Sequence, residues 1–287
     1  MLYIVINKYS GGYSQRRIFY LEKSVEKEFP EFTIRETVLD KHRVSADINP
    51  MEIKKGDIIV AAGGDGTINA CLQFIHDNSL QEQILLGVIP LGTGNNMIGS
   101  LKLPRTIESA VNVLKKRRFE QISYSSINGS KVFFNCSIGF SSFVLKNRKT
   151  SSLAGYFYET ARLLPLYKSC KIKFAEKENC LDLFAGFFIN TKVYMSKFKF
   201  LKANNSGNMM KFFYIEGANF ITGLTDTLKA FTGIKEYKTM ERNGFKFDLP
   251  ENHYIELDGD IFEIGENNRT ITLENCSTVK IITNGDI

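Results

Sequence analysis

Histidine and cysteine are scarce in this chain, and their scarcity removes several classes of site. The 287 residues include 3 histidines and 5 cysteines. An odd number of cysteines without a Cys-x-x-Cys pair predicts free thiols in a reducing compartment rather than a disulfide framework. The histidines, His42, His76 and His253, form no motif with metal-ligand spacing, so a zinc site is not expected.

The chain also lacks long apolar runs. The longest, such as "LFAGFFI" at 183–189, are far shorter than the ~20 residues that span a bilayer. The opening residues, "MLYIVINKYSGG", lack the basic segment that begins a secretory signal. The expectation is therefore a cytoplasmic protein that associates peripherally with a membrane surface.

Acidic residues are nearly absent from one basic stretch. The formal net charge is +6. Between Ser141 and Lys173, Glu159 is the one acid among Lys146, Arg148, Lys149, Arg162, Lys168, Lys171 and Lys173. Residues 191–202, "TKVYMSKFKFLK", add four lysines and no acid. These stretches form either a solvated face or a patch for an anionic surface. The interleaved aromatic residues favour lipid head groups over nucleic acid.

Strand and helix patterns alternate in the first part of the chain. The predicted strands are 2–7, 32–38, 57–61 and 84–90, and the predicted helices are 15–29, 67–77 and 106–117. This alternation is typical of a parallel sheet covered on both faces. In such sheets, ligands bind at the carboxyl ends of the strands.

The pattern changes near residue 120. The "NG" at 128–129 predicts a hairpin. Further strands are predicted at 170–175, 182–194, 210–216, 252–257, 260–264, 269–274 and 278–283, with helices at 153–165 and 223–231. The predicted fold class is α/β plus mainly-β: a parallel α/β lobe over 1–120, an antiparallel β-sandwich lobe over 121–287, and a cleft between them.

The loop "GGDGT" at 63–67 lies between a predicted strand and a predicted helix. Its bare backbone and the helix start that follows are suited to binding an anion. It lacks the lysine of a P-loop. Asp65 would repel phosphate unless Mg²⁺ lies between them or the carboxylate accepts a proton from an attacking hydroxyl. The alternative is that Asp65 only caps the helix.

Three other segments follow strands in a similar way. The loops "NKYSGG" at 7–12 and "PLGTGNN" at 90–96 could each be a plain turn, but together with 63–67 they would meet at one sheet edge. In "ELDGDIFEI", Asp258 and Asp260 flank Gly259. This segment is either a hairpin turn or a pair of carboxylates that converge on a metal or a substrate hydroxyl.

Together the motifs resemble the diacylglycerol kinase catalytic family, most closely its bacterial soluble lipid kinases, with sphingosine kinases and NAD kinases more distant. The resemblance rests on "NKYSGG", "GGDGTIN", "PLGTGNN", "NCSIGF" at 135–140 and "DGD" at 258–260. It implies a nucleotide-binding domain over 1–120 and a substrate domain over 121–287. It also implies ATP in the cleft between them and Mg²⁺-dependent transfer of the γ-phosphoryl group to a lipid hydroxyl.

Carried onto this chain, the resemblance implies catalytic roles for Asp65, Asp258 and Asp260, with Asp65 also as the Mg²⁺ ligand. The implied nucleotide-binding residues are Asn7, Ser10, Gly11, Thr37, Gly63, Gly64, Asp65, Gly66, Thr67, Asn69, Gly92, Thr93 and Asn95. Several positions differ from the usual family pattern. Ala70 replaces glutamate, Asn96 followed by "MIGS" replaces aspartate and a "FAR"-like run, and Asp260 shortens the usual "DGE" by one methylene. "NSG" at 205–207 replaces the "DG" segment that can hold a structural Mg²⁺ in the family, so that metal site is not expected here.

The expected function is therefore an ATP-dependent phosphotransferase with an alcohol acceptor, a diacylglycerol-like lipid of phospholipid biosynthesis. Two alternatives stay open: a kinase of a soluble substrate such as NAD, and a non-catalytic relative that binds nucleotide or lipid. The expected partners are ATP and a lipid at a membrane surface, without nucleic acid. A homodimer and the identity of the lipid are left open by the sequence.

Overall fold

The structure, a computed structural model, describes residues 1–10, 12–40, 43–92, 96–101, 103–149, 153–175, 180–190, 193–194, 201–202, 209–217, 221, 225–226, 237–251, 253–262, 264 and 269–284. The chain divides into two compact units. The first comprises Met1–Tyr124, Thr191–Lys202 and Cys276–Ile287, and the second comprises Ser125–Asn190 and Ala203–Asn275.

A parallel sheet forms the centre of the first unit. Its strands are β1 (Leu2–Ile6), β2 (Phe32–Asp40), β4 (Ile58–Gly63) and β5 (Leu85–Pro90), with β3 (Arg43–Ala46) antiparallel beside β2. Its helices are α1 (Gln15–Glu26), α2 (Asp65–Asp77), α3 (Asn96–Ser100) and α4 (Ile107–Lys116), with a 3-10 turn, η1, at Pro50–Glu52. A short pair, β11 (Val193–Tyr194) and β12 (Leu201–Lys202), also belongs to this unit.

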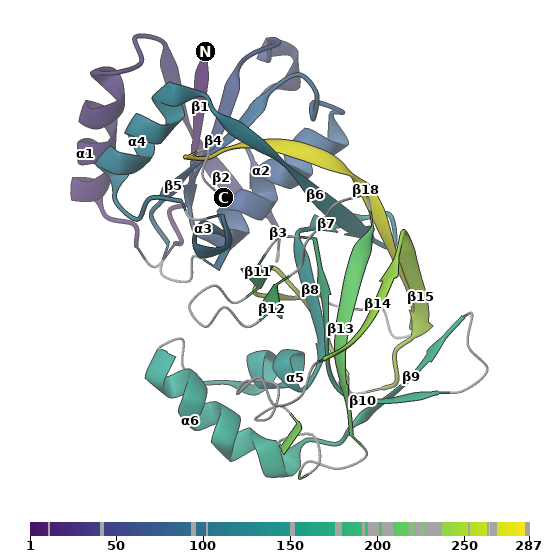
Figure 1. Ribbon diagram of the computed structural model, residues 1–287. Coiled ribbons are helices and arrows are strands. Elements are labelled where there is room, and N and C mark those ends of the chain that lie inside the picture. The colour runs from purple at the N-terminus through teal and green to yellow at the C-terminus, as the bar shows by residue number, and fades with distance from the viewer. Residues whose placement is uncertain are drawn as a thin grey trace. The chain divides into compact units, whose positions relative to one another are not determined.

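The helices cover both faces of this sheet. In Figure 1, α1 and α4 lie on one side and α2 on the other. Helix α1 begins where the Ser14 hydroxyl accepts the Arg17 N–H, and it buries Leu21 and Val25. Helix α4 begins where Thr106 accepts the Ser109 N–H. These serine and threonine caps satisfy N–H groups that have no partner inside the helix.

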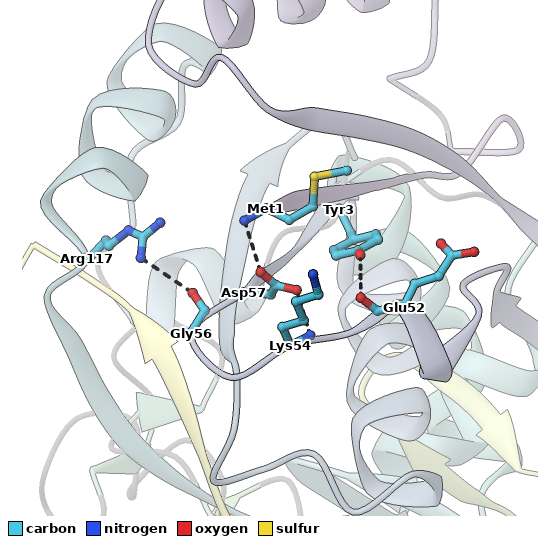
Figure 2. Close-up of polar contacts among 7 residues, drawn as sticks. All are labelled: Met1, Tyr3, Glu52, Lys54, Gly56, Asp57 and Arg117. Atoms are coloured by element: carbon cyan, nitrogen blue, oxygen red, sulfur yellow. Dashed lines mark hydrogen bonds and ion pairs between the residues drawn. The ribbon is translucent and has the colours of Figure 1, made fainter.

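The amino ends of β1 and β4 are joined through Asp57, as Figure 2 shows. Its Oδ1 accepts the Met1 ammonium at 3.0 Å, and its Oδ2 accepts the Lys54 N–H at 2.8 Å. Nearby, the Tyr3 hydroxyl donates to the Glu52 carbonyl at 3.0 Å, and the Arg117 guanidinium donates to the Gly56 carbonyl at 3.4 Å. Asp57 is only 6% exposed, so its contacts are largely shielded from water.

Replacing Asp57 with alanine is expected to lower the free energy of unfolding by about 1–3 kcal/mol. The reason is that the Lys54 N–H and the terminal ammonium lose a shielded acceptor. Urea denaturation of Asp57→Ala beside Asp47→Ala measures this, because Asp47 is exposed and should change stability by no more than ~0.5 kcal/mol. Equal unfolding midpoints for the two variants would show that the Asp57 contacts contribute nothing.

Antiparallel strands form most of the second unit. They are β7 (Lys131–Phe133), β8 (Asn135–Gly139), β9 (Cys170–Phe174), β10 (Leu181–Ile189), β13 (Met210–Glu216), β14 (Lys238–Arg242), β15 (Gly244–Asp248), β16 (Ile255–Leu257) and β17 (Asp260–Phe262). Helices α5 (Phe140–Asn147) and α6 (Leu153–Leu163) and the 3-10 turn η2 (Leu164–Leu166) accompany them. Aromatic rings fill the core, where Phe188 and Phe212 stack at 4.1 Å.

Two strands contribute residues to both units: β6 (Phe119–Ile127) and β18 (Thr270–Ile282). The sequence predicts two separate strands at 269–274 and 278–283, and this is wrong, because β18 is continuous. Its first half pairs with β15, and Ile281 pairs in parallel with Leu86 of β5. Residues 276–287 therefore belong to the first unit, which differs from the predicted division into 1–120 and 121–287.

The predicted fold class is confirmed, a parallel α/β region followed by a mainly antiparallel β region. The hairpin at "NG" is present, and Asn128 and Gly129 adopt the positive φ of 50° and 61° that this turn requires. Several elements lack a counterpart among the predictions: β3, η1, α3, α5, β12, β14 and β15. The predicted helix at 223–231 lies almost entirely outside the described residues.

Candidate functional site

Strands β1 and β4 end at nearly the same level of the sheet, beside β2, which continues to Asp40. The β1 register pairs Ile6 with Glu36 of β2 and with Ala62 of β4. The next residue on each strand belongs to the predicted site: Asn7, Thr37 and Gly63. The sheet therefore brings Asn7 and Gly63 to the carboxyl ends of their strands, with Thr37 beside them inside β2, where it pairs with Ala46 of β3.

The first loop is shaped by its own polar groups. The Tyr9 N–H donates to the Asn7 side-chain oxygen at 2.8 Å, and the Tyr13 N–H donates to the Ser10 carbonyl at 2.9 Å. This asparagine-centred turn folds the chain back immediately after β1. Asn7 therefore shapes the loop, whatever else it contacts.

The second and third loops are joined by backbone hydrogen bonds. The Gly63 carbonyl accepts the N–H groups of Leu91 and Gly92 at 3.1 and 3.0 Å. A Cβ on Gly63 would lie 2.0 Å from the Thr67 hydroxyl oxygen, so only glycine allows α2 to start this close to β4. Gly64 precedes α2, and its carbonyl accepts the Thr67 N–H at 3.0 Å.

Arg17, which the sequence analysis did not single out, joins the first and third loops. Its Nη1 donates to the Gly12 carbonyl at 2.8 Å, and its Nη2 donates to the Pro90 carbonyl at 3.0 Å. The loops also touch directly, because a Cβ on Gly12 would lie 1.8 Å from the Leu91 carbonyl oxygen. The three glycine-rich loops thus form one connected structure at the sheet edge.

Arg17→Lys is expected to weaken ATP binding roughly 2- to 10-fold. An ammonium lacks the planar fork that serves both carbonyls, so one hydrogen bond worth about 0.5–1.5 kcal/mol is lost. Calorimetric titration with a non-hydrolysable ATP analogue measures the change. Arg35→Lys is the matched control, since Arg35 lies on β2 and its 3.9 Å contact with Glu52 is largely exposed. Unchanged affinity in Arg17→Lys would contradict a bridging role.

Asp65 does not cap α2, because Gly64 occupies that position. Its carboxylate instead accepts the Met97 N–H at 3.1 Å and so holds the start of α3. A negative side chain in the first turn of α2 is also favourable with the helix dipole. Among the described residues, no cluster of three or more His, Cys, Asp or Glu side chains could hold a metal.

Three hydroxyl oxygens at this edge are buried and have no hydrogen-bond partner within the described residues: Ser10 Oγ, Thr37 Oγ1 and Thr67 Oγ1. Buried hydroxyls without a partner are uncommon in folded proteins, because leaving one unsatisfied costs about 1–3 kcal/mol. All three were predicted to bind nucleotide. Three hydroxyls that lack hydrogen-bond partners are suited to a ligand with many acceptor oxygens.

The other predicted nucleotide-binding residues lie near this edge of the sheet or outside the residues that the structure describes. Gly66 and Asn69 lie in the first turns of α2, and Asn69 is 9% exposed. Gly11, Thr93 and Asn95 lie outside the described residues.

In the second unit, "DGD" is the turn between β16 and β17. Asp258 and Gly259 have φ values of 48° and 98°, and Leu257 pairs with Asp260. Both Asp258 oxygens accept backbone N–H groups, from Phe134 at 2.9 Å and from Asn135 at 2.8 Å. Asp258 therefore anchors this turn to β8.

Asp260 is different, because its side chain is exposed. No hydrogen bond or ion pair joins its carboxylate to another residue in the described part of the chain. Of the two predicted acids on this turn, Asp260 is thus the one that is available to a substrate.

Glu256, which was not predicted, lies beneath the same turn. It is only 7% exposed; Oε1 accepts the Gly259 N–H at 2.7 Å, and Oε2 accepts the Ser137 hydroxyl. Burial first, and then the carboxylates of Glu256 and Asp258, raise the pKa of the neighbouring Cys136 thiol. This cysteine is therefore a neutral core residue and not a nucleophile.

The basic stretch of the second unit is partly described. The Arg162 guanidinium pairs with Glu159, and the Lys146 ammonium lies 5.4 Å from the centre of the Tyr254 ring. Exposed apolar side chains lie near these residues in the sequence, Tyr158 at 67% and Leu166 at 64%. None of the helices in the described part of the chain is long and apolar enough to cross a membrane. Lys197 and Lys199 lie outside the described residues.

Comparison with known proteins supports the resemblance. Residues 1–127 match the family described as diacylglycerol kinase catalytic domain. A Yersinia pestis protein named "Probable lipid kinase YegS-like" is 33% identical over 81 residues, or 28% of this chain. That match spans only 27% of the relative's own length.

Two solved structures share the fold. A diacylglycerol kinase from Bacillus anthracis aligns over 99% of this chain and 96% of its own, with a TM-score of 0.66 and 16% identity. Yeast NADH kinase complexed with NADH aligns over 99% and 83%, with a TM-score of 0.52 and 8% identity. The resemblance predicted from the sequence motifs is thus confirmed over residues 1–127, which are similar to the diacylglycerol kinase catalytic domain family.

Proposed function

We propose that this protein is an ATP-dependent lipid kinase that transfers the γ-phosphoryl group to the hydroxyl of a diacylglycerol-like lipid. The observation that carries the proposal is the set of three buried hydroxyls without partners, Ser10, Thr37 and Thr67, at the edge where the glycine-rich loops are joined. A phosphorylated nucleotide supplies the acceptor oxygens that these groups lack.

The residues at this edge are suited to a triphosphate. Gly63 and Gly64 present backbone without side chains, and the start of α2 favours negative charge nearby. We propose that the Asp65 carboxylate, which also accepts the Met97 N–H, would hold Mg²⁺. When bound, ATP would supply the γ-phosphoryl group, and Mg²⁺ would neutralise part of the negative charge of the phosphates.

Asp260 is proposed as the base that accepts the proton of the lipid hydroxyl. It lies on a turn held from two sides, by Asp258 through the backbone of β8 and by Glu256 through the Gly259 N–H. Because other residues fix this turn, the Asp260 carboxylate is held in position while remaining exposed. Asp258 and Glu256 then act as positioning residues.

The proposed acceptor is a lipid because the second unit combines basic and exposed apolar side chains around α5, α6 and η2. Basic residues near an anionic bilayer contribute about 1 kcal/mol each, and aromatic side chains suit the interface. We propose that this face docks on the membrane peripherally while ATP arrives from solution.

Charge reversal of Lys146 and Lys149 to glutamate is expected to weaken binding to anionic vesicles by about tenfold or more, since two attractive contacts become repulsive. Co-sedimentation at low and high salt measures this. Lys54 and Lys55, reversed together in the first unit, provide a control of equal charge change, and ATP affinity should be unaltered in both variants. If vesicle binding changed neither with salt nor with the charge reversal of Lys146 and Lys149, these lysines would not be part of the membrane-binding surface.

The function is tested with labelled ATP and Mg²⁺ in three parallel reactions, containing a total lipid extract in mixed micelles, NAD, or neither. Label in a lipid phosphate supports the proposal, and identification of that product names the acceptor. Label in NADP would instead establish a kinase of a soluble substrate. Absence of transfer in all three, with ATP binding intact, would indicate a non-catalytic relative.

A further inference from the structure

A hollow lined by positively charged side chains lies on the first unit. It has a volume of about 600 Å³ and opens between α1 and the start of α4. Its lining residues are Arg16, Arg17, Tyr20, Arg105, Thr106, Ile107 and Glu108. None of them belongs to the glycine-rich loops or to the predicted nucleotide-binding set, although Arg17 donates hydrogen bonds to two of those loops.

The lining is strongly positive. Arg16, Arg17 and Arg105 contribute three cations against the single carboxylate of Glu108, a formal balance of +2. No ion pair or hydrogen bond joins Arg16 or Arg105 to another residue in the described parts of the chain. Arg17 donates only to neutral carbonyl groups, so its charge is not balanced either. Guanidinium groups gathered without counter-charges repel one another, and an anion among them relieves this repulsion.

The lining and volume of the hollow indicate which kind of anion it could bind. Guanidinium forks match the oxygens of phosphate, to which they can donate paired hydrogen bonds. The volume is that of a small-molecule site and exceeds what a bare phosphate fills. Tyr20 and Ile107 offer an apolar wall for an organic group, while Glu108 can accept a hydrogen bond from a hydroxyl. The Thr106 hydroxyl already accepts the Ser109 N–H, so the arginines carry the site and not the helix end.

We infer that this hollow binds a small phosphate monoester that bears a hydroxylated or apolar body, at a site separate from the nucleotide loops. The phosphate could belong to a soluble metabolite or to a lipid head group. The chemistry of recognition is the same for both, and the experiment below separates them.

Arg17 gives the site a means of influencing the nucleotide loops. Its guanidinium lines the hollow and also bonds to Gly12 and Pro90 of the first and third loops. An anion that draws Arg17 toward the hollow loosens those bonds, and ligand in the hollow therefore weakens ATP binding. By linkage, ATP weakens the anion by the same factor. This coupling rests on the proposed function, whereas binding of the phosphate ester does not.

Binding is tested by calorimetric titration of the nucleotide-free protein with sn-glycerol 3-phosphate at constant ionic strength. The Arg16→Gln/Arg105→Gln double variant is expected to bind at least about tenfold more weakly than the parent protein. The matched control, Arg35→Gln/Lys55→Gln, makes the same change of charge away from the hollow and should bind like the parent. Equal affinity in the double variant, or no binding at millimolar ester, would overturn the inference.

A vesicle arm identifies the source of the phosphate. Vesicles of phosphatidylcholine with and without phosphatidic acid replace the soluble ester in the same set of variants. Arginine-dependent binding of the soluble ester supports a free metabolite, and arginine-dependent binding of phosphatidic acid vesicles alone supports a head group. A protein that shows either behaviour but phosphorylates no substrate would refute the proposed function and leave this site standing.

Discussion

Replacing Asp65 with asparagine is expected to reduce ATP-dependent turnover by about 10²- to 10³-fold while the fold survives. The asparagine Oδ1 can still accept the Met97 N–H, so this hydrogen bond between α2 and α3 is kept while the negative charge is lost. Loss of a metal-bound charge costs several kcal/mol of transition-state stabilisation, and each 1.36 kcal/mol is about tenfold in rate. Single-turnover kinetics over a Mg²⁺ titration measure the effect.

Asp65→Ala serves as the companion variant. It removes the acceptor for Met97 as well as the charge, so it should also lower the melting temperature, which Asp65→Asn should leave nearly unchanged. Full activity in Asp65→Asn would mean that the carboxylate only anchors α3. The metal ligand would then have to be another group.

The second large effect is expected at Asp260, where asparagine should cut lipid turnover by about 10²- to 10⁴-fold, the usual contribution of a general base. Stability should not change, because the side chain is exposed and makes no hydrogen bond or ion pair within the described residues. Asp258→Asn, in contrast, should lower the stability of the protein. Its amide N–H₂ would face the Phe134 or Asn135 N–H, leaving a donor without an acceptor and lowering stability by about 1–3 kcal/mol.

Measured together, turnover and urea unfolding separate these roles. Asp260→Glu restores the side-chain length that is usual in the family and should retain activity or raise it. If Asp260→Asn were fully active while Asp258→Asn lost turnover without losing stability, the base would be Asp258. The anchoring contacts would then be secondary to its chemistry.

The local features of the site were predictable because their signals are local. A strand that ends in Gly63 and Gly64 before a helix start can be recognised in five consecutive residues, and the parallel alternation places such loops at one edge. The "NG" and "DG" hairpins follow from backbone conformations that few residues adopt. Strand and helix types in the first 120 residues were accordingly close to those observed.

The remaining contacts are long-range, and no short pattern contains them. Arg17 donates to Pro90, 73 residues away, and the Phe134 N–H donates to Asp258, 124 residues away. A carboxylate in a turn looks the same in the sequence whether it anchors backbone or is available to a substrate. The anchoring role of Asp258 and the support from buried Glu256 therefore could not be predicted from sequence.

The pairing of β18 with β5 also has a consequence for folding during synthesis, because β5 is made long before its partner. Its last part pairs with β5, yet Cys276 follows Pro90 by 186 positions in the chain. At roughly 5–20 residues per second, β5 leaves the ribosome some 10–40 s before its neighbour exists. For that interval the apolar edge of β5 is an open pairing surface of the kind that recruits foreign strands. The nascent first unit is therefore expected to need chaperone protection until the last part of β18 emerges.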